Sequence, residues 1–168
     1  MTVVALCFAS KKGEAMTSVD ELGVVAGGGI VGDRYLAAVQ RHPGQNITLI
    51  EAEEIEEFNA RNGTHLVLTD PRRNVITRNV RLNNLVGVEF RIGSARFRGV
   101  ELCEPCGTLS RYLSPQAMSK QVFIREFTHR CGLRADVIGT GEVRVGDAIV
   151  PVVTDPRHNY QLERQRHE

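Results

Sequence analysis

The sequence has no long hydrophobic run, few aromatic residues and almost no net charge. Its longest apolar segment, residues 3–9, is far shorter than the about 20 residues that a membrane-spanning helix needs. No basic residue precedes this segment and no clear cleavage site follows it, so we expect no secretory signal peptide. The 21 Lys and Arg against 20 Asp and Glu leave a net charge of +1, which argues against nucleic acid and anionic membranes as partners. We expect a cytoplasmic protein, whose four cysteines are thiols rather than halves of disulfides.

The length and composition predict one folded domain. The chain has 168 residues, 42% of them hydrophobic and 24% charged, which is close to the average of globular proteins and excludes global disorder. We predict a single, mainly β domain over residues 1–153. Residues 154–168 lack hydrophobic periodicity and are interpreted as a C-terminal tail.

The basic residues are strongly biased towards arginine. Of the 21 basic residues 18 are Arg, and seven of these lie between Arg72 and Arg98, where Glu89 is the one acid. A GC-rich genome would explain the bias. Alternatively, part of the arginine set recognises a planar or phosphorylated anion, because guanidinium groups suit such ligands.

Periodicity predicts strands at residues 3–8 and 46–50 and a helix at residues 51–61. The helix has acids in its first turn, Arg61 in its last, and then Asn62–Gly63, which is typical of a left-handed C-cap. A second helix is predicted to begin with Ser114 as N-cap and Pro115 as its first residue.

Two later segments have similar sequences, and we interpret both as antiparallel strand pairs. Residues 89–98 alternate around Gly93–Ser94, which is typical of a hairpin, and residues 142–150 repeat much of the same pattern.

Residues 27–32 match a dinucleotide-binding fingerprint, with Gly27, Gly29 and Gly32 at the required spacing. The chain beyond residue 70 shows no further βαβ pattern, and Asp33 and Arg34 place charges where the helix should pack. We interpret the glycines as a turn that needs positive φ.

A Cys-x-x-Cys pair, Cys103 and Cys106, is compatible with several functions. The pair could complete a zinc site with His129 and Cys131, although the second half of that site has an unusual spacing. A redox dithiol, a single reactive thiol and an inert buried pair are the other possibilities.

Residues 72–77 place two guanidinium groups, an amide and a hydroxyl at the start of a strand. Such a segment could hold a phosphate and the edge of a heterocycle, or it could be an ordinary exposed strand start.

In their order along the chain, these segments resemble the MOSC domain, which is named after the C-terminal part of molybdenum cofactor sulfurase. The matching segments are GIVGDR (29–34), RRNVIT (72–77), LNNLVG (82–87), FRIG (90–93), CEPC (103–106), GLRA (132–135) and VGD (145–147). The resemblance implies an antiparallel, β-barrel-like domain with a few short helices, and an association with the molybdenum cofactor, a molybdopterin.

The resemblance also implies roles for individual residues. Cys106, which follows a proline, is expected to be a molybdenum ligand or a persulfide carrier. The expected cofactor-binding residues are Arg73, Asn74 and Thr77 for the pterin and its phosphate, with Arg34 and Arg134 in family motifs. A soft thiolate suits the metal, and arginines suit the anionic pterin.

Two activities fit this family: sulfur transfer, and molybdenum-dependent reduction of N-hydroxylated compounds. The chain has no pyridoxal phosphate domain, so an external cysteine desulfurase or an electron-donor protein is the expected partner, together with a small-molecule substrate. The alternatives are a structural zinc module built from Cys103, Cys106, His129 and Cys131, and a carrier that holds the cofactor without catalysis.

Overall fold

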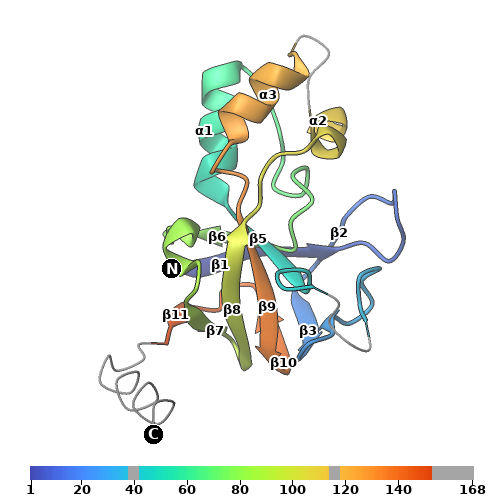
Figure 1. Ribbon diagram of the computed structural model, residues 1–168, viewed down its shortest axis with the longest axis vertical. Helices are drawn as coiled ribbons and strands as arrows, with labels where there is room; N and C mark the ends of the chain where they lie inside the picture. Colours follow the sequence, from blue (N-terminus) through green and yellow to red (C-terminus); the bar gives the residue numbers. More distant parts are fainter. Residues whose placement is uncertain (38–41, 114–117, 153–168) are drawn as a thin grey trace, which may run out of the picture.

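The described residues form more strand than helix, as the sequence predicts. The structure is a computed structural model that describes residues 1–37, 42–113 and 118–152. The strands are β1 (Thr2–Phe8), β2 (Thr17–Val19), β3 (Glu21–Val25), β4 (Gly29–Ile30), β5 (Ile47–Glu51), β6 (Val75–Arg78), β7 (Glu89–Ile92), β8 (Ala95–Leu102), β9 (Leu133–Gly139), β10 (Gly141–Arg144) and β11 (Ile149–Pro151). The helices are α1 (Ala52–Asn62), α2 (Gly107–Leu113), α3 (Lys120–Phe127) and the 3-10 helix η1 (Leu82–Leu85). The three α-helices gather at one end of the sheets (Figure 1).

Two sheets organise the strands. The larger has the order β11-β7-β8-β9-β5-β6-β1-β2, and the smaller has the order β10-β3-β4. Neighbouring strands are antiparallel except β5 and β6, which pair in parallel and are connected through α1. This crossover places the loop before β6 beside the start of β5, which matters for the site described below.

The large sheet curves back on itself. The N–H of Ile149 donates to the carbonyl of Met1 over 3.1 Å, and the N–H of Val3 donates to the carbonyl of Asp147 over 2.9 Å. These bonds join the start of β1 to the segment that leads into β11. Within the described residues β2 and β11 remain the edges of the sheet, so the architecture is barrel-like but not closed.

The core has two parts. One lies within the sheets, and the other fills the space between the large sheet and the helices. In the second part the ring of Phe58 on α1 contacts Phe123 and Phe127 on α3, with ring centroids 5.8 and 4.3 Å apart. Burial of these aromatic rings fixes the helical layer on the sheet.

Helix α1 confirms its prediction almost to the residue. Gly63 follows it with φ 61°, and the N–H of Gly63 donates to the carbonyl of Asn59, as a left-handed C-cap requires.

For the second predicted helix, the described residues place the N-cap at Ser119, whose hydroxyl accepts from the N–H of Val122 over 3.3 Å. The predicted start at Ser114 and Pro115 lies outside the described residues. None of the helices in residues 1–37, 42–113 and 118–152 is long and apolar enough to cross a membrane.

One of the two predicted strand pairs is confirmed and the other is wrong. Strands β7 and β8 pair across Gly93–Ser94, from Glu89 opposite Arg98 to Ile92 opposite Ala95. In contrast, β10 pairs with β3, whereas β11 pairs with β7 in the other sheet. The turn after β10 is held by Asp20 and Val3 through backbone hydrogen bonds, so it directs β11 away from β10 rather than back along it.

The Gly-rich segment is a turn, as predicted, and not a nucleotide-binding loop. Gly27, Gly29 and Gly32 have φ of 68°, 106° and 83°, and the segment forms the tight connection between β3 and β4 and the loop after β4.

Candidate functional site

A cavity of about 630 Å³ opens between the start of β5, the loop before β6 and the start of α2. Its size is typical of a small-molecule or cofactor site. Four stretches of chain and one strand residue form its wall: residues 33–37, 44–48, 72–74, Cys106 with Leu109, and Arg134 of β9. The parallel crossover from β5 to β6 is what brings residues 47–48 and 72–74 to the same wall.

The wall of the cavity is strongly cationic. Four arginines contribute to it, and Asp33 is the one carboxylate among its lining residues; the arginines are Arg34, Arg72, Arg73 and Arg134. Arginines gathered in this way attract an anion with several acceptor oxygens, such as a phosphate. The charge bias predicted from the sequence is therefore concentrated, in part, at one place in the fold.

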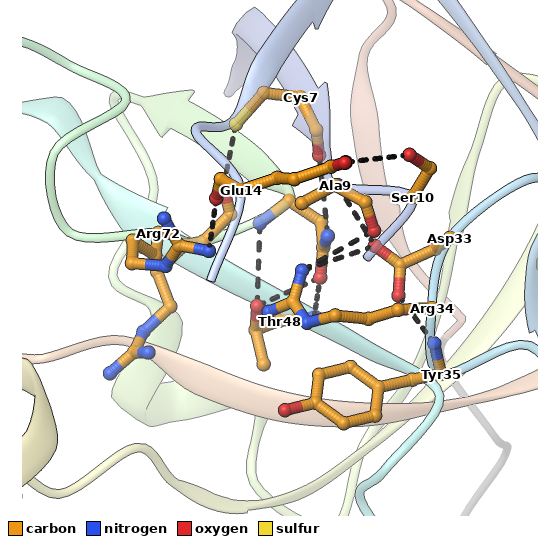
Figure 2. A network of polar contacts seen from close by, with 11 residues as sticks. Cys7, Ala9, Ser10, Glu14, Asp33, Arg34, Tyr35, Thr48 and Arg72 are labelled. Carbon is orange, nitrogen blue, oxygen red and sulfur yellow. Dashed lines mark hydrogen bonds and ion pairs between the residues drawn. The ribbon is translucent and has the colours of Figure 1, made fainter. Parts of the chain in front are cut away.

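Arg34 is oriented by the loop that follows β4. Asp33 is buried, and its carboxylate accepts from the N–H of Ala9 over 3.3 Å and from the N–H of Tyr35 over 2.8 Å. The guanidinium of Arg34 donates to the carbonyl of Ala9 over 3.4 Å and lies 4.5 Å from the centre of the Tyr35 ring. Figure 2 shows this network, in which the Tyr35 ring lies beside the Arg34 side chain. Through these two hydrogen bonds Asp33 fixes the loop that follows β4.

Arg72 enters the cavity from a strained backbone position. It has a left-handed φ of 58°, which is uncommon for a residue with a Cβ. Its Nη2 donates to the carbonyl of Glu14 over 2.8 Å (Figure 2). The strain and the anchored guanidinium together set the direction in which the chain enters β6.

Asn74 holds three strands together at the cavity wall. Its Oδ1 accepts from both the N–H and the hydroxyl of Thr48, over 3.1 and 2.9 Å, and its Nδ2 donates to the carbonyl of Cys7 over 3.2 Å. Most of the hydrogen-bonding capacity of this amide is therefore used inside the protein. Its main role is to fix the loop that carries Arg73 against β5 and β1.

Cys106 is the cysteine on the cavity wall. It is exposed, whereas Cys7, Cys103 and Cys131 are buried, and no disulfide joins any of the four, as the sequence predicts. Cys106 immediately precedes α2, a helix that the sequence analysis missed, and its carbonyl accepts from the N–H of Ser110 over 3.0 Å. The start of α2 therefore fixes the backbone of Cys106.

Arg73 lies among the other thiols. Its Nε donates to the carbonyl of Cys131 over 2.9 Å, and its Nη2 donates to the Sγ of Cys131 over 3.0 Å. Burial alone would lower the pKa of Arg73, but the charges of Cys103, Cys131 and Cys106 raise it above its ordinary value. Burial raises the pKa of Cys103, and the charges of Arg73 and Arg134 oppose that shift. The guanidinium is thus a fixed cation shared by a cluster of thiols.

Cys7 differs from the other buried thiols because it acts as a hydrogen-bond donor. Its Sγ donates to the carbonyl of Arg73 over 2.9 Å. Burial raises the pKa of Cys7 to about 12; the charge of Arg72 lowers it and the charge of Asp33 raises it, both by smaller amounts. This thiol stays protonated at neutral pH and is structural.

The four-ligand zinc site considered from the sequence does not form. Among the described residues, no group of three His, Cys, Asp or Glu side chains is arranged to hold a metal ion. His129 is exposed, and its Nδ1 lies 2.8 Å from a carboxylate oxygen of Glu104. Arg73 occupies the near side of Cys131, where a guanidinium repels a metal cation. As the structure describes them, Cys103, Cys106, His129 and Cys131 are not arranged as a metal site.

The other predicted site residues divide into two groups. Arg134 lines the cavity, with its Nε 3.6 Å from a carboxylate oxygen of Glu101. Thr77 does not reach the cavity: it is fully buried, and its hydroxyl donates to the carbonyl of Ile50 over 3.1 Å. Thr77 links β6 to β5 and has no exposed atom to offer a ligand.

Several lining residues lie outside the segments that the sequence motifs single out. Tyr35, Leu36 and Leu109 give the cavity an apolar part, and Thr48 supports Asn74. Tyr35 and Leu36 directly follow the family segment that ends at Arg34, which was the available signal. Thr48 is the polar residue between the apolar Ile47 and Leu49 of β5, so its position on the opposite face of the strand could have been inferred.

Comparison with known families decides the class of the protein. The family model described as MOSC domain matches residues 37–150. The chain belongs to the MOSC domain family. The match confirms the family resemblance for the segments from residue 72 onward and includes the loop before β6, Cys106 and Arg134, whereas the segment at residues 29–34 lies before it.

Solved structures of MOSC-like fold extend the comparison to nearly the whole chain. The YuaD protein from Bacillus subtilis superimposes with a TM-score of 0.75 at 23% identity, covering 92% of this chain and 98% of that one. YiiM from Escherichia coli gives 0.68 at 19% identity, with 92% and 71% covered, and YiiM from Geobacillus stearothermophilus gives 0.63 at 14%, with 90% and 73% covered. A search of curated proteins gave no significant match. At these identities the structures show a common fold.

Proposed function

We propose that this MOSC protein binds the molybdenum cofactor in the cationic cavity, with Cys106 as its thiolate ligand to the metal. The observation that carries the proposal is the exposed thiol of Cys106 on the wall of a cavity that four arginines line. The family's association with this cofactor names the ligand, and the chemistry of the wall supports it.

The residues fit the chemical groups of the cofactor. Its phosphate and pterin require cationic and hydrogen-bonding partners, which Arg34, Arg72 and Arg134 supply at the cavity wall. Molybdenum in a sulfur-rich environment favours a soft thiolate, which Cys106 supplies. The apolar part formed by Tyr35 leaves room for an organic group beside the cofactor.

The side chains at the proposed site have different roles. Arg73 uses two of its five N–H groups on Cys131 and brings a positive charge close to Cys106, so it stabilises the thiolate form. Asn74 and Thr48 keep the loop in place, and Thr77 reinforces the same pair of strands from inside. The bound cofactor itself would supply two-electron redox chemistry at the metal.

Two reactions are compatible with a cofactor in this cavity, and Cys106 is the ligand to the metal in the first and a persulfide carrier in the second. In a reductase, electrons from an external donor protein would remove oxygen from an N-hydroxylated substrate, and the apolar wall around Tyr35 and Leu109 favours an organic substrate. In a sulfur-transfer protein, Cys106 would carry a sulfane sulfur delivered by an external desulfurase. The cluster of thiols around Arg73 favours the second reaction, because a reductase needs Cys106 alone.

The test is the cofactor content of protein purified without oxygen from a host that makes the cofactor. Molybdenum and oxidised pterin should copurify in near-equal amounts with the wild type and should be lost, by at least about tenfold, from Cys106→Ser. Cys103→Ser is the matched control, because Cys103 is buried and is not a lining residue, so it should keep the molybdenum. Wild-type protein without molybdenum or pterin would contradict the proposal.

A further inference from the structure

Three cysteines of different accessibility interact with the Arg73 guanidinium, Cys131 through hydrogen bonds and Cys103 and Cys106 through charge. Cys106 lies on the cavity wall, whereas the residues Cys103 and Cys131 are 2% and 0% exposed. Arg73 donates to the Sγ of Cys131 over 3.0 Å and interacts electrostatically with both other thiols. A single metal ligand or sulfur carrier does not explain why two more thiols lie in the same positive field.

The link between Cys103 and Cys106 is short and is anchored at both ends. The N–H of Cys103 donates to the carbonyl of Gly132 over 2.7 Å, and the carbonyl of Cys106 accepts from the first turn of α2. Glu104 and Pro105 between them belong to neither strand nor helix. A local rearrangement of this link can therefore bring the two sulfurs together while β8 and α2 stay in place.

We propose that Cys103 is a resolving thiol, which releases a sulfane sulfur carried on Cys106 as sulfide. The proposal rests on the sulfur-transfer reaction of the proposed function. The Cys103 sulfur attacks the Sγ of the Cys106 persulfide and forms a Cys103–Cys106 disulfide. The bond between this Sγ and the outer sulfur breaks, and the outer sulfur leaves with the electron pair as hydrosulfide.

Atoms and electrons are conserved in this step without a further reactant. The sulfane sulfur gains two electrons, the two cysteine sulfurs lose two, and the proton of the Cys103 thiol leaves with the sulfide or passes to solvent. An external dithiol, or two molecules of a thiol such as glutathione, then reduces the disulfide and restores both thiols. Sulfide is released into the cavity, beside the position where the proposed metal would be held.

Cys103 is better suited to this step than the other buried thiols. Arg73 and Arg134 both counteract the rise in its pKa that burial causes. Cys131 is held by Arg73 through its carbonyl and its Sγ, and it follows His129, which has a left-handed φ of 62°. Cys7 donates its proton to a backbone carbonyl and has a pKa of about 12.

The experiment treats the reduced, full-length protein with one equivalent of inorganic polysulfide under anaerobic conditions. Released sulfide and intact mass are followed over time, and the disulfide is then mapped by peptide mass spectrometry. Wild-type protein should first gain the mass of one sulfur atom and then lose it, together with two hydrogen atoms, as one equivalent of sulfide appears. In Cys103→Ser and Cys103→Ala the persulfide should persist, and sulfide release should slow at least about tenfold. Cys7→Ser, in which a hydroxyl replaces the donor thiol, should behave like the wild type.

The outcomes separate the two proposals. Wild-type protein that takes up no sulfane sulfur at Cys106 contradicts the sulfur-transfer reaction itself. A persulfide at Cys106 that releases sulfide equally fast in the folded Cys103 variants overturns the role of Cys103 alone. A disulfide mapped between Cys106 and Cys131 overturns it as well. Thermal melting of each variant establishes that it is folded.

Discussion

The Nη2 of Arg73 donates a hydrogen bond to the Sγ of Cys131, 3.0 Å away, from a loop 58 residues distant in sequence. The contact joins the loop before β6 to the turn before β9. Arg73 lines the cavity, and so does Arg134 of β9, three residues after Cys131. The shape of the cavity therefore depends on a bond between a cation and a thiol, and this bond can be tested separately from any ligand.

Replacement of Arg73 by methionine should destabilise the protein by about 1–3 kcal/mol, because the buried carbonyl and Sγ of Cys131 lose their donor. Urea denaturation of purified protein measures the change. Arg125→Met on the exposed side of α3 is the control and should change the free energy of unfolding by less than about 0.5 kcal/mol. Equal stabilities of the two variants would show that the contact contributes nothing.

The four thiols should react in two separate phases. Cys106 is exposed, whereas burial raises the pKa of Cys7, Cys103 and Cys131, so one thiol should react rapidly with a disulfide reagent in native protein. The other three should react only after unfolding. In Cys106→Ser the rapid phase should disappear. A rapid phase that persists in this variant would mean that another thiol is accessible.

Gly132 should tolerate no side chain. Its φ is 103°, and a Cβ there would lie 1.9 Å from the carbonyl oxygen of Leu49, in the backbone of β5. We expect Gly132→Ala to lose more than about 4 kcal/mol or to fail to fold. Gly27→Ala is the matched control: its φ is 68° with no atom within 4 Å of an added Cβ, so a loss of about 1–2 kcal/mol is expected. Similar melting temperatures for both variants would contradict this contrast.

Glu51 should give the protein one component of stability that is lost as the pH rises. Burial raises its pKa above the ordinary value, against the opposing effects of the hydrogen bond from Leu82 N–H and the charge of Arg81. The folded protein therefore binds this proton more tightly than the unfolded chain does. The stabilisation is complete below the unfolded pKa and is lost as the pH rises through the folded pKa.

Glu51→Gln keeps an acceptor for Leu82 and removes the titration. The free energy of unfolding of the wild type minus that of the variant should fall as the pH is raised from about 4 to about 7. A difference that stays constant or grows with pH would contradict the raised pKa. Glu56 and Glu89, whose pKa values are lowered by arginine partners, are present in both proteins and cancel in the difference.

Local sequence patterns predicted the helices and strand pairs that local interactions stabilise. Helix α1 follows from its periodicity and from Gly63, and the β7–β8 hairpin follows from alternation around Gly93–Ser94. The strand pair predicted at residues 142–150 was wrong because the turn after β10 has the sequence pattern of a hairpin turn. Its strands join different sheets through long-range contacts that no local pattern contains. Helix α2 was missed because it is only one short helix, of seven residues, that begins with a glycine.

The site was predicted through the family resemblance rather than through local patterns. Cys106 and Arg73 are 33 positions apart, and no periodicity connects them. The resemblance named both, and both line the cavity. It also named Thr77, which the fold buries as a link between β5 and β6. The structural role of Asn74 depends on Thr48 and Cys7, which lie 26 and 67 positions away, and only the assembled sheet brings them together.

The sulfur coordination of molybdenum, measured by X-ray absorption on anaerobically purified protein, tests the central claim most directly. The cofactor supplies the sulfurs of its own dithiolene, and Cys106 should add one thiolate at the bond length of a metal–sulfur ligand. We predict one more sulfur neighbour per molybdenum in the wild-type protein than in the isolated cofactor. A sulfur count equal to that of the isolated cofactor would contradict the assignment of Cys106 as the ligand.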